Sequence, residues 1–97
     1  MVSCFNKINF SLAFGMEKKS EANKKFDKQF GEFIKSQRLH RGWTQEQLAD
    51  KIGNNYQNVS RIERGEVTPT LFWCTNLAAA FEMNLVAFVK KLQAEKF

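Results

Sequence analysis

Histidine and proline each occur once in this sequence of 97 residues, and cysteine occurs only twice. Cys4 and Cys74 lie 70 positions apart, and His40 is the only other soft metal ligand. That set is too small for a four-coordinate zinc site. We therefore expect reduced thiols and no bound metal.

Long apolar runs are also missing. No stretch approaches the ~20 apolar residues that a membrane-spanning helix needs. The apolar residues near the N-terminus are interrupted by Asn6, Lys7, Asn9 and Ser11, which fits an export signal poorly. The expected location is the cytoplasm, with no membrane partner.

Groups for catalysis are equally scarce. The sequence shows no acid pair, no nucleophile with a nearby base and no glycine-rich phosphate loop, and its single histidine lies among basic residues. We expect a protein that is not an enzyme and that needs no cofactor.

Apolar side chains and positive charge are what the sequence does supply. Hydrophobic residues make up 43%, with ten phenylalanines, which is enough for one folded domain. The formal net charge is +5, and it is unevenly placed. Residues 1–25 hold five lysines and two glutamates, residues 26–65 hold seven basic and five acidic residues, and residues 66–97 hold three of each. All of the excess charge lies in the first two thirds, which favours a nucleic-acid partner.

The first 19 residues form an N-terminal extension in this reading. Ile8, Phe10, Leu12 and Phe14 alternate with smaller or polar residues, which is typical of a half-buried strand. Such a strand has no partner elsewhere in the chain. Two interpretations stay open: an arm that pairs with its counterpart in a dimer, or a weakly ordered leader upstream of a second possible start at Met16.

Residues 20–97 show helical periodicity throughout. Apolar or long side chains recur every four residues from Ala22 to Arg38, which predicts a long helix ending near Gly42. A capping box at Thr44–Gln47 then opens a short helix that stops at Gly53. Asn55 can cap a third helix, with Val59 and Ile62 inward and Gly65 at its end.

Two more helices complete the domain. Thr68 or Thr70, on either side of the single proline, can cap a helix that carries Leu71 to Phe81. Asn84 begins the last helix, whose apolar side carries Leu85, Phe88, Val89 and Leu92. The predicted fold class is all-α, with five helices in one domain.

The stretch GWTQEQLADKIGNNYQNVSRIERG, residues 42–65, resembles the helix-turn-helix of the Cro/cI-type (XRE) family of phage repressors and bacterial regulators. The shared features come in order: Thr-Gln at the start of one short helix, Leu-Ala in its middle, a glycine at the turn, and Ile-Glu-Arg-Gly at the end of the next. The resemblance runs through Thr68-Pro69-Thr70-Leu71 and covers roughly residues 28–90.

The resemblance implies a DNA-binding role for the third helix, at about residues 55–64. In this motif the second short helix enters the major groove and the preceding helix crosses the sugar-phosphate backbone. Gln57 and Arg61 would read bases, because an amide or a guanidinium group can form two hydrogen bonds with the edge of one base. Gln45, Arg64 and Lys51 would contact phosphates. The implied DNA surface consists of Gln45, Asn55, Tyr56, Gln57, Asn58, Arg61 and Arg64.

The resemblance also implies a structural ion pair between Arg38, on the first helix, and Glu63, near the end of the third. Two residues depart from the family pattern. Asn54 and Gln37 stand where apolar residues are usual. The turn and that corner of the core are therefore expected to be looser or packed in another way.

The resulting hypothesis is a sequence-specific transcription regulator, a repressor in its simplest form, that binds palindromic double-stranded DNA as a homodimer. The candidate dimer residues are Phe72, Trp73, Phe88, Val89 and Leu92. The alternative is that the last three close the monomer core and that the aromatics cover the N-terminal helix or leader.

A second hypothesis is an antitoxin or other component that binds a protein partner, such as a toxin, and regulates its own DNA secondarily. The exposed aromatics or the extension would then contact that partner. A controller protein of a restriction-modification system is a third option within the DNA-binding class.

Overall fold

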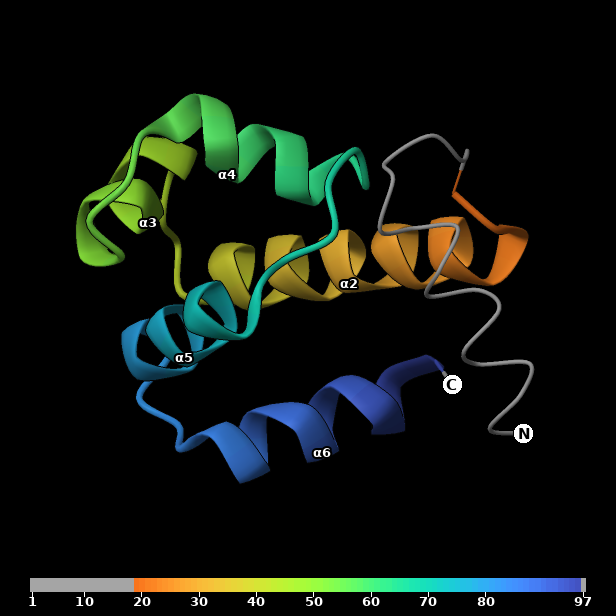
Figure 1. The fold of residues 1–97 in the computed structure, drawn as a ribbon. Helices are drawn as coiled ribbons and strands as arrows, with labels where there is room; N and C mark the ends of the chain where they lie inside the picture. The colour runs from red at the N-terminus through yellow and green to blue at the C-terminus, as the bar shows by residue number, and fades with distance from the viewer. Residues whose placement is uncertain (1–18, 97) are drawn as a thin grey trace.

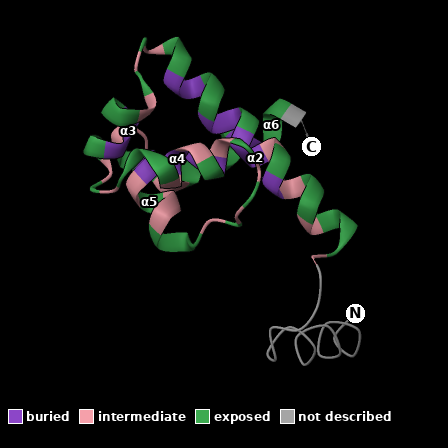
Figure 2. Ribbon diagram, turned by 90° about the horizontal axis from the view of Figure 1, so that it is seen from above, coloured by how far each residue is buried: buried purple, intermediate pink, exposed green. Residues whose placement is uncertain are grey.

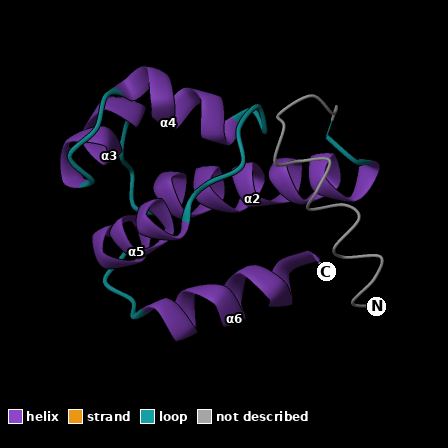
Figure 3. Cartoon of the chain, viewed as in Figure 1, coloured by secondary structure: helices purple, strands orange, loops and turns teal. Residues whose placement is uncertain are grey.

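The computed structural model describes residues 19–96, with the side chains of residues 19–95. Within that range the chain consists of helices joined by loops and contains no strand (Figures 1 and 3). The elements are α2 (Glu21–His40), α3 (Gln45–Lys51), α4 (Tyr56–Glu63), α5 (Leu71–Ala80) and α6 (Leu85–Lys96). The predicted all-α class with five helices is thus confirmed. The strand pattern at residues 8–14, Met16 and Cys4 lie outside the described residues.

Side-chain caps begin the helices where the sequence predicts them. Thr44 Oγ1 accepts a hydrogen bond from the Gln47 backbone N–H at 3.0 Å, and Gln47 Oε1 accepts one from the Thr44 N–H at 2.8 Å. Thr70 caps α5 through the Trp73 N–H at 3.1 Å. Each such cap stabilises its helix by about 1 kcal/mol. The short helix α3 needs that help, because helices of this length are marginal alone.

α2 lies between the α3–α4 pair and α6 (Figure 1). Buried residues recur along α2 (Figure 2), in agreement with its predicted apolar face. Phe88 of α6 meets Phe30 and Phe33 of α2 edge-on, with ring centroids 6.1 and 5.4 Å apart. The core they form also contains Ile34, Leu48, Ala49, Val59, Ile62, Leu77, Ala78, Phe81 and Leu92.

A single glycine sets how closely α2 approaches α4. A Cβ placed on Gly31 would lie 2.4 Å from the Ile62 carbonyl oxygen and 2.6 Å from the Glu63 carbonyl oxygen. Both contacts are with backbone, so no side-chain movement could relieve them. The absence of a side chain at Gly31 therefore lets α2 support α4 directly.

The corner that contains Gln37 is packed through polar contacts rather than loosely. Gln37 is 7% exposed. Arg41 Nη1 donates to Gln37 Oε1 at 3.0 Å, and Arg41 Nη2 donates to the Phe81 carbonyl at 2.9 Å. The Arg41 guanidinium also lies 4.8 Å from the Phe81 ring centroid. The polar residue at 37 is thus satisfied by an arginine that fastens α2 to the end of α5.

A buried carboxylate holds the loop after α4 against α2. Asp27 Oδ2 accepts hydrogen bonds from Lys19 Nζ at 2.6 Å and from Thr68 Oγ1 at 2.8 Å. Thr68 therefore serves this cluster and leaves the capping of α5 to Thr70. The same Lys19 amine donates to the Glu66 carbonyl at 3.2 Å.

No single helix among the described residues is long and apolar enough to cross a membrane. α5 and α6 pass that test only as a pair, which is bent by 93°. Leu77, Phe81 and Phe88 of this pair lie in the core.

Candidate nucleic-acid interface

α4 turns a polar, basic face to solvent. Val59 and Ile62 point into the core, as predicted, and the opposite side exposes Gln57, Arg61 and Arg64. Tyr56 is 46% exposed at the first turn. The Gln57 amide and the Arg61 guanidinium make no side-chain hydrogen bond within the described chain, so both are free to bond base edges.

Asn54 organises the turn before α4. Its Oδ1 accepts hydrogen bonds from the Asn55 backbone N–H at 2.8 Å and from Asn58 Nδ2 at 2.7 Å. The residue before it, Gly53, has φ +68°, a backbone conformation that favours glycine. The turn is therefore closed by hydrogen bonds where the family uses an apolar contact, and it is not looser.

The same contacts limit two of the predicted DNA residues. Asn55 Oδ1 caps α4 by accepting from the Asn58 backbone N–H at 2.9 Å. The Asn58 amide nitrogen is engaged by Asn54 and the residue is only partly exposed. Asn55 and Asn58 thus build the start of α4, which favours a structural role for both over the DNA contacts that the resemblance implied.

Glu63 is the centre of a buried clamp. Arg38 Nε donates to Glu63 Oε2 at 2.7 Å and Arg38 Nη2 donates to Oε1 at 3.0 Å, with side-chain exposures of 9% and 3%. Arg38 Nη1 also donates to the Trp43 carbonyl at 2.7 Å. The ion pair that the resemblance implied is present, and it fixes the C-terminal end of α4 to α2.

Gln45 joins this clamp. Its Nε2 donates to Glu63 Oε1 at 3.0 Å, so the side chain is oriented before any DNA is bound. The predicted phosphate contact of Gln45 stays a prediction. It would use the amide N–H that is not directed at Glu63.

Arg64 is partly neutralised by its neighbour. Its Nε donates to Glu66 Oε2 at 2.7 Å, and its Nη1 donates to the Ser60 hydroxyl. The hydrogen bond from Arg64 lowers the pKa of Glu66, and the hydrogen bond to Glu66 raises the pKa of Arg64. Both groups are exposed, so a phosphate would have to compete with Glu66 for Arg64.

The candidate dimer residues divide into two groups. Phe88 and Leu92 are buried in the monomer and close its core, and Trp73 is partly buried against that core. Phe72 is 69% exposed and Val89 is 39% exposed. Phe72 and Val89 are therefore the most accessible of the five to a partner surface, whereas Phe88 and Leu92 are used by the monomer core.

The sequence did not predict one close helix contact and two exposed apolar side chains. Gly31 was visible only as a glycine within a helical pattern. Leu71 belongs to the predicted apolar pattern of its helix but is exposed, and Val86, which the sequence did not single out, is exposed as well. Cys74 is free and half-buried, and burial raises the pKa of its thiol.

Comparisons with known proteins bear on this geometry. A family model described as a helix-turn-helix, HTH_3, matches residues 34–88. The chain is 33% identical over 52 residues to YgzD of Bacillus subtilis (strain 168), named as an uncharacterized HTH-type transcriptional regulator; the match covers 54% of this chain and 79% of that protein.

Two solved structures are similar in fold. One is the restriction-modification controller protein C.AhdI from Aeromonas hydrophila, at 27% identity and a TM-score of 0.60. That match covers 64% of this chain and 94% of the controller protein. The other is an HTH_3 family transcriptional regulator from Vibrio cholerae, at 27% identity and a TM-score of 0.65, covering 74% of this chain and 41% of that one.

Proposed function

Since the chain belongs to the XRE-type helix-turn-helix (HTH_3) family of transcription regulators, we propose that it binds a palindromic operator as a homodimer and represses the adjacent genes. The observation that carries the proposal is the outward face of α4. Gln57 and Arg61 stand there without a side-chain hydrogen bond to any described residue, on a helix whose two ends are fixed by Asn55 and Glu63. A helix held in this way can enter the major groove as a rigid reader.

Each predicted contact has a distinct chemical role in this proposal. Arg61 is suited to guanine and Gln57 to adenine, because each can form two parallel hydrogen bonds with that base. Gln45 and Arg64 would contact phosphates, which position the protein on the duplex without reading sequence. Tyr56, at the exposed first turn of α4, would contact a thymine methyl group or a phosphate.

A homodimer is proposed because one α4 reads only a few base pairs. The net charge of +5 also allows few phosphate contacts per monomer. A two-fold symmetric dimer doubles both the base contacts and the phosphate contacts, and thereby reaches a useful specificity. The surface that we propose for the contact is the outer side of α6, where Val86 and Val89 are exposed one turn apart, with Phe72 of α5 as a second apolar contact.

Selection of bound duplexes from a random DNA pool tests the operator. We expect a palindrome whose half-sites are spaced by about one helical turn, roughly 34 Å, or a multiple of it. Enrichment of no sequence would overturn the proposal. A reporter gene with the selected site in its promoter should be expressed less when the protein is present. Higher expression would mean that the protein is an activator and would overturn the proposed repression.

Size-exclusion chromatography with light scattering tests the homodimer separately. We expect a dimer at tens of micromolar and a monomer after Val86 and Val89 are both replaced by lysine, with an unchanged helical circular dichroism signal. A wild-type chain that is monomeric under these conditions and selects only single half-sites would overturn the homodimer.

A controller protein of a restriction-modification system is the second candidate function. The likeness to C.AhdI favours it, because nearly the whole of that controller protein is matched. A selected site upstream of restriction or methyltransferase genes would support this role. Stoichiometric co-purification with an adjacent gene product would instead favour a partner-binding component such as an antitoxin, with Phe72 as the contact to test first.

A further inference from the structure

Lys28 and Lys35 are two of three lysines on α2 that carry charge without an ion pair to any described residue. Both are exposed. The third, Lys25, lies nearer the start of the helix. Its neighbours Lys19 and Lys24 do form ion pairs. Lys19 is paired with Asp27 at 2.6 Å, and Lys24 is paired with Glu21 at 3.6 Å.

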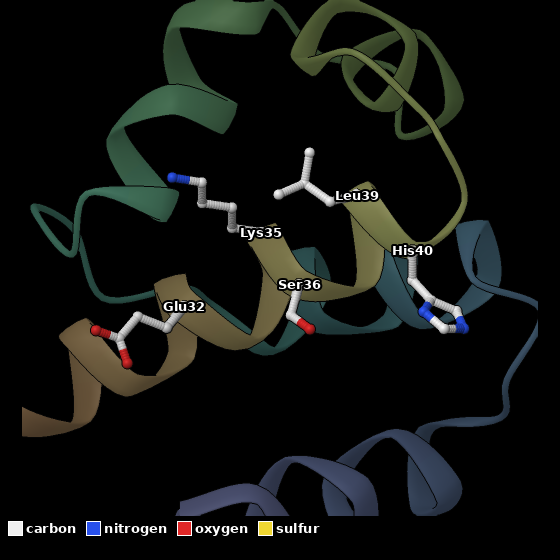
Figure 4. A pocket seen from close by; sticks show the side chains of 5 residues that line it. All are labelled: Glu32, Lys35, Ser36, Leu39 and His40. Atoms are coloured by element: carbon white, nitrogen blue, oxygen red, sulfur yellow. The ribbon is translucent and has the colours of Figure 1, made fainter.

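Both lysines lie along the side of α2 that faces α4. A Cβ placed on Gly65 would be 3.0 Å from the Lys28 Cα, so Lys28 sits beside the turn that ends α4. Lys35 follows seven residues later, about 10.5 Å along the helix axis and on nearly the same side. Figure 4 shows its side chain extending toward α4 from a shallow hollow of about 490 Å³ on α2.

Gln45, another predicted phosphate contact, also lies near the end of α4. It lies at the start of α3 and is tied to Glu63 of α4, which is also the partner of Arg38 on α2. Gln45, through Glu63, and Lys28, beside Gly65, therefore both lie near the C-terminal end of α4.

We infer that Lys28 and Lys35 bind phosphates of the DNA strand that borders α4 on its α2 side. The inference rests on the proposed function, since it requires α4 to occupy the major groove. That groove is about 12 Å wide, so a helix inside it has a phosphate backbone close on either side. The two ammonium groups lie in line on α2 and have no ion pair with a described residue, so their positive charge complements the negative phosphates. They would contribute affinity without reading sequence.

Glu32 is the opposing charge in this row. It lies one helical turn from Lys28 and is also exposed, yet it forms no ion pair with any described residue. Its carboxylate repels the same phosphates. The row therefore predicts opposite effects for neutralising the lysines and for neutralising Glu32.

The test is the salt dependence of binding to a mixed-sequence duplex of about 20 base pairs, measured by fluorescence anisotropy of the full chain. The double variant Lys28→Gln/Lys35→Gln is compared with Lys90→Gln/Lys91→Gln, which removes the same charge from exposed positions on α6, across α2 from α4 (Figure 1). Between about 50 and 200 mM salt, log K falls as log [salt] rises. The slope of this fall should be shallower in the α2 variant by about 1.8, or 0.9 for each lost phosphate contact. Glu32→Gln should tighten binding, and the α6 variant should keep the wild-type slope.

The outcomes separate this inference from the proposed function. Equal slopes for the α2 and α6 double variants, with both folded by circular dichroism, would overturn the inference and leave the proposed function intact. A loss for the α2 variant on the selected operator only, and none on mixed sequence, would also overturn it. A wild-type chain that binds no duplex would overturn the proposed function, and the inference with it.

Discussion

Arg38 and Glu63 form a two-point ion pair across the interface between α2 and α4, with donor–acceptor distances of 2.7 and 3.0 Å. The two residues lie 25 positions apart in sequence, and both side chains are nearly excluded from solvent. The pair fixes the end of α4 away from the capped start, so the exposed face of that helix has one orientation. The two-fold hydrogen bonding adds geometric restraint as well as energy.

Glu63→Gln should be among the most destabilising single substitutions at the interface between α2 and α4. It leaves the Arg38 charge buried without its counter-ion, which costs about 3–5 kcal/mol for a fully buried pair. Urea unfolding followed by circular dichroism measures the loss. Glu32→Gln is the matched control on exposed α2 and should change stability by less than about 0.5 kcal/mol. A Glu63→Gln loss as small as that of the control would show that the pair does not hold α4.

Gly31→Ala should destabilise the protein although alanine favours helix. Alanine gains about 1 kcal/mol of helix propensity over glycine. That gain is outweighed because the new Cβ would meet the Ile62 and Glu63 carbonyl oxygens, at 2.4 and 2.6 Å, and overpacking of this kind costs about 1–3 kcal/mol. Thermal unfolding compares it with Ser36→Ala, an exposed α2 site where the change should be close to neutral. A stabilised Gly31→Ala variant would contradict the close approach of α2 and α4.

Glu66→Gln should strengthen binding to any duplex, because it releases Arg64 for a phosphate. One added phosphate contact is worth up to about tenfold in affinity at 0.1 M salt. The pKa of Glu66 is lowered in the folded protein, so the ion pair is complete above the ordinary glutamate pKa and is lost only as the pH falls through the lowered value. The gain should therefore be the same at about pH 6 and about pH 8. A gain that disappears between these two pH values would rule out this cause.

Asn58→Ala and Gln57→Ala should separate structure from recognition. The Asn58 amide is bonded to Asn54 at 2.7 Å, so its loss should cost about 1 kcal/mol of stability and change DNA binding little. Gln57 has no such partner among the described residues, and its replacement should leave stability unchanged while weakening operator binding by roughly 1–3 kcal/mol. Unfolding curves and operator titrations of the two variants provide the comparison. The reverse pattern would assign base reading to Asn58.

Local signals in the sequence predicted most of the fold. The caps at Thr44, Asn55 and Thr70 and the inward positions Val59 and Ile62 follow from side-chain chemistry within one helical turn, and all are observed. The contact of Gly31 with α4 could not be predicted, because it depends on how two distant helices cross. The polar contacts of Gln37 with Arg41 are equally invisible, since they involve the carbonyl of Phe81, 40 residues away from Arg41.

Periodicity also could not distinguish core from partner surface on α6. Both uses require an apolar stripe, so Phe88, Val89 and Leu92 were equivalent candidates in the sequence. The packing of α6 against α2 separates them, because Phe88 and Leu92 turn inward and Val89 turns outward. For the proposed DNA surface, the sequence resemblance pointed to α4, and the structure shows which side chains of that helix already form hydrogen bonds within the protein.

The central claim, that the outer face of α4 reads DNA sequence, is tested most directly with Arg61→Ala. The measurement is the affinity of wild type and variant for the selected operator and for duplexes with each base pair replaced in turn. The variant should lose discrimination at one base pair of each half-site, by roughly 1–3 kcal/mol, and keep it elsewhere. An equal loss on the operator and on random DNA would make Arg61 a phosphate contact and would contradict the claim.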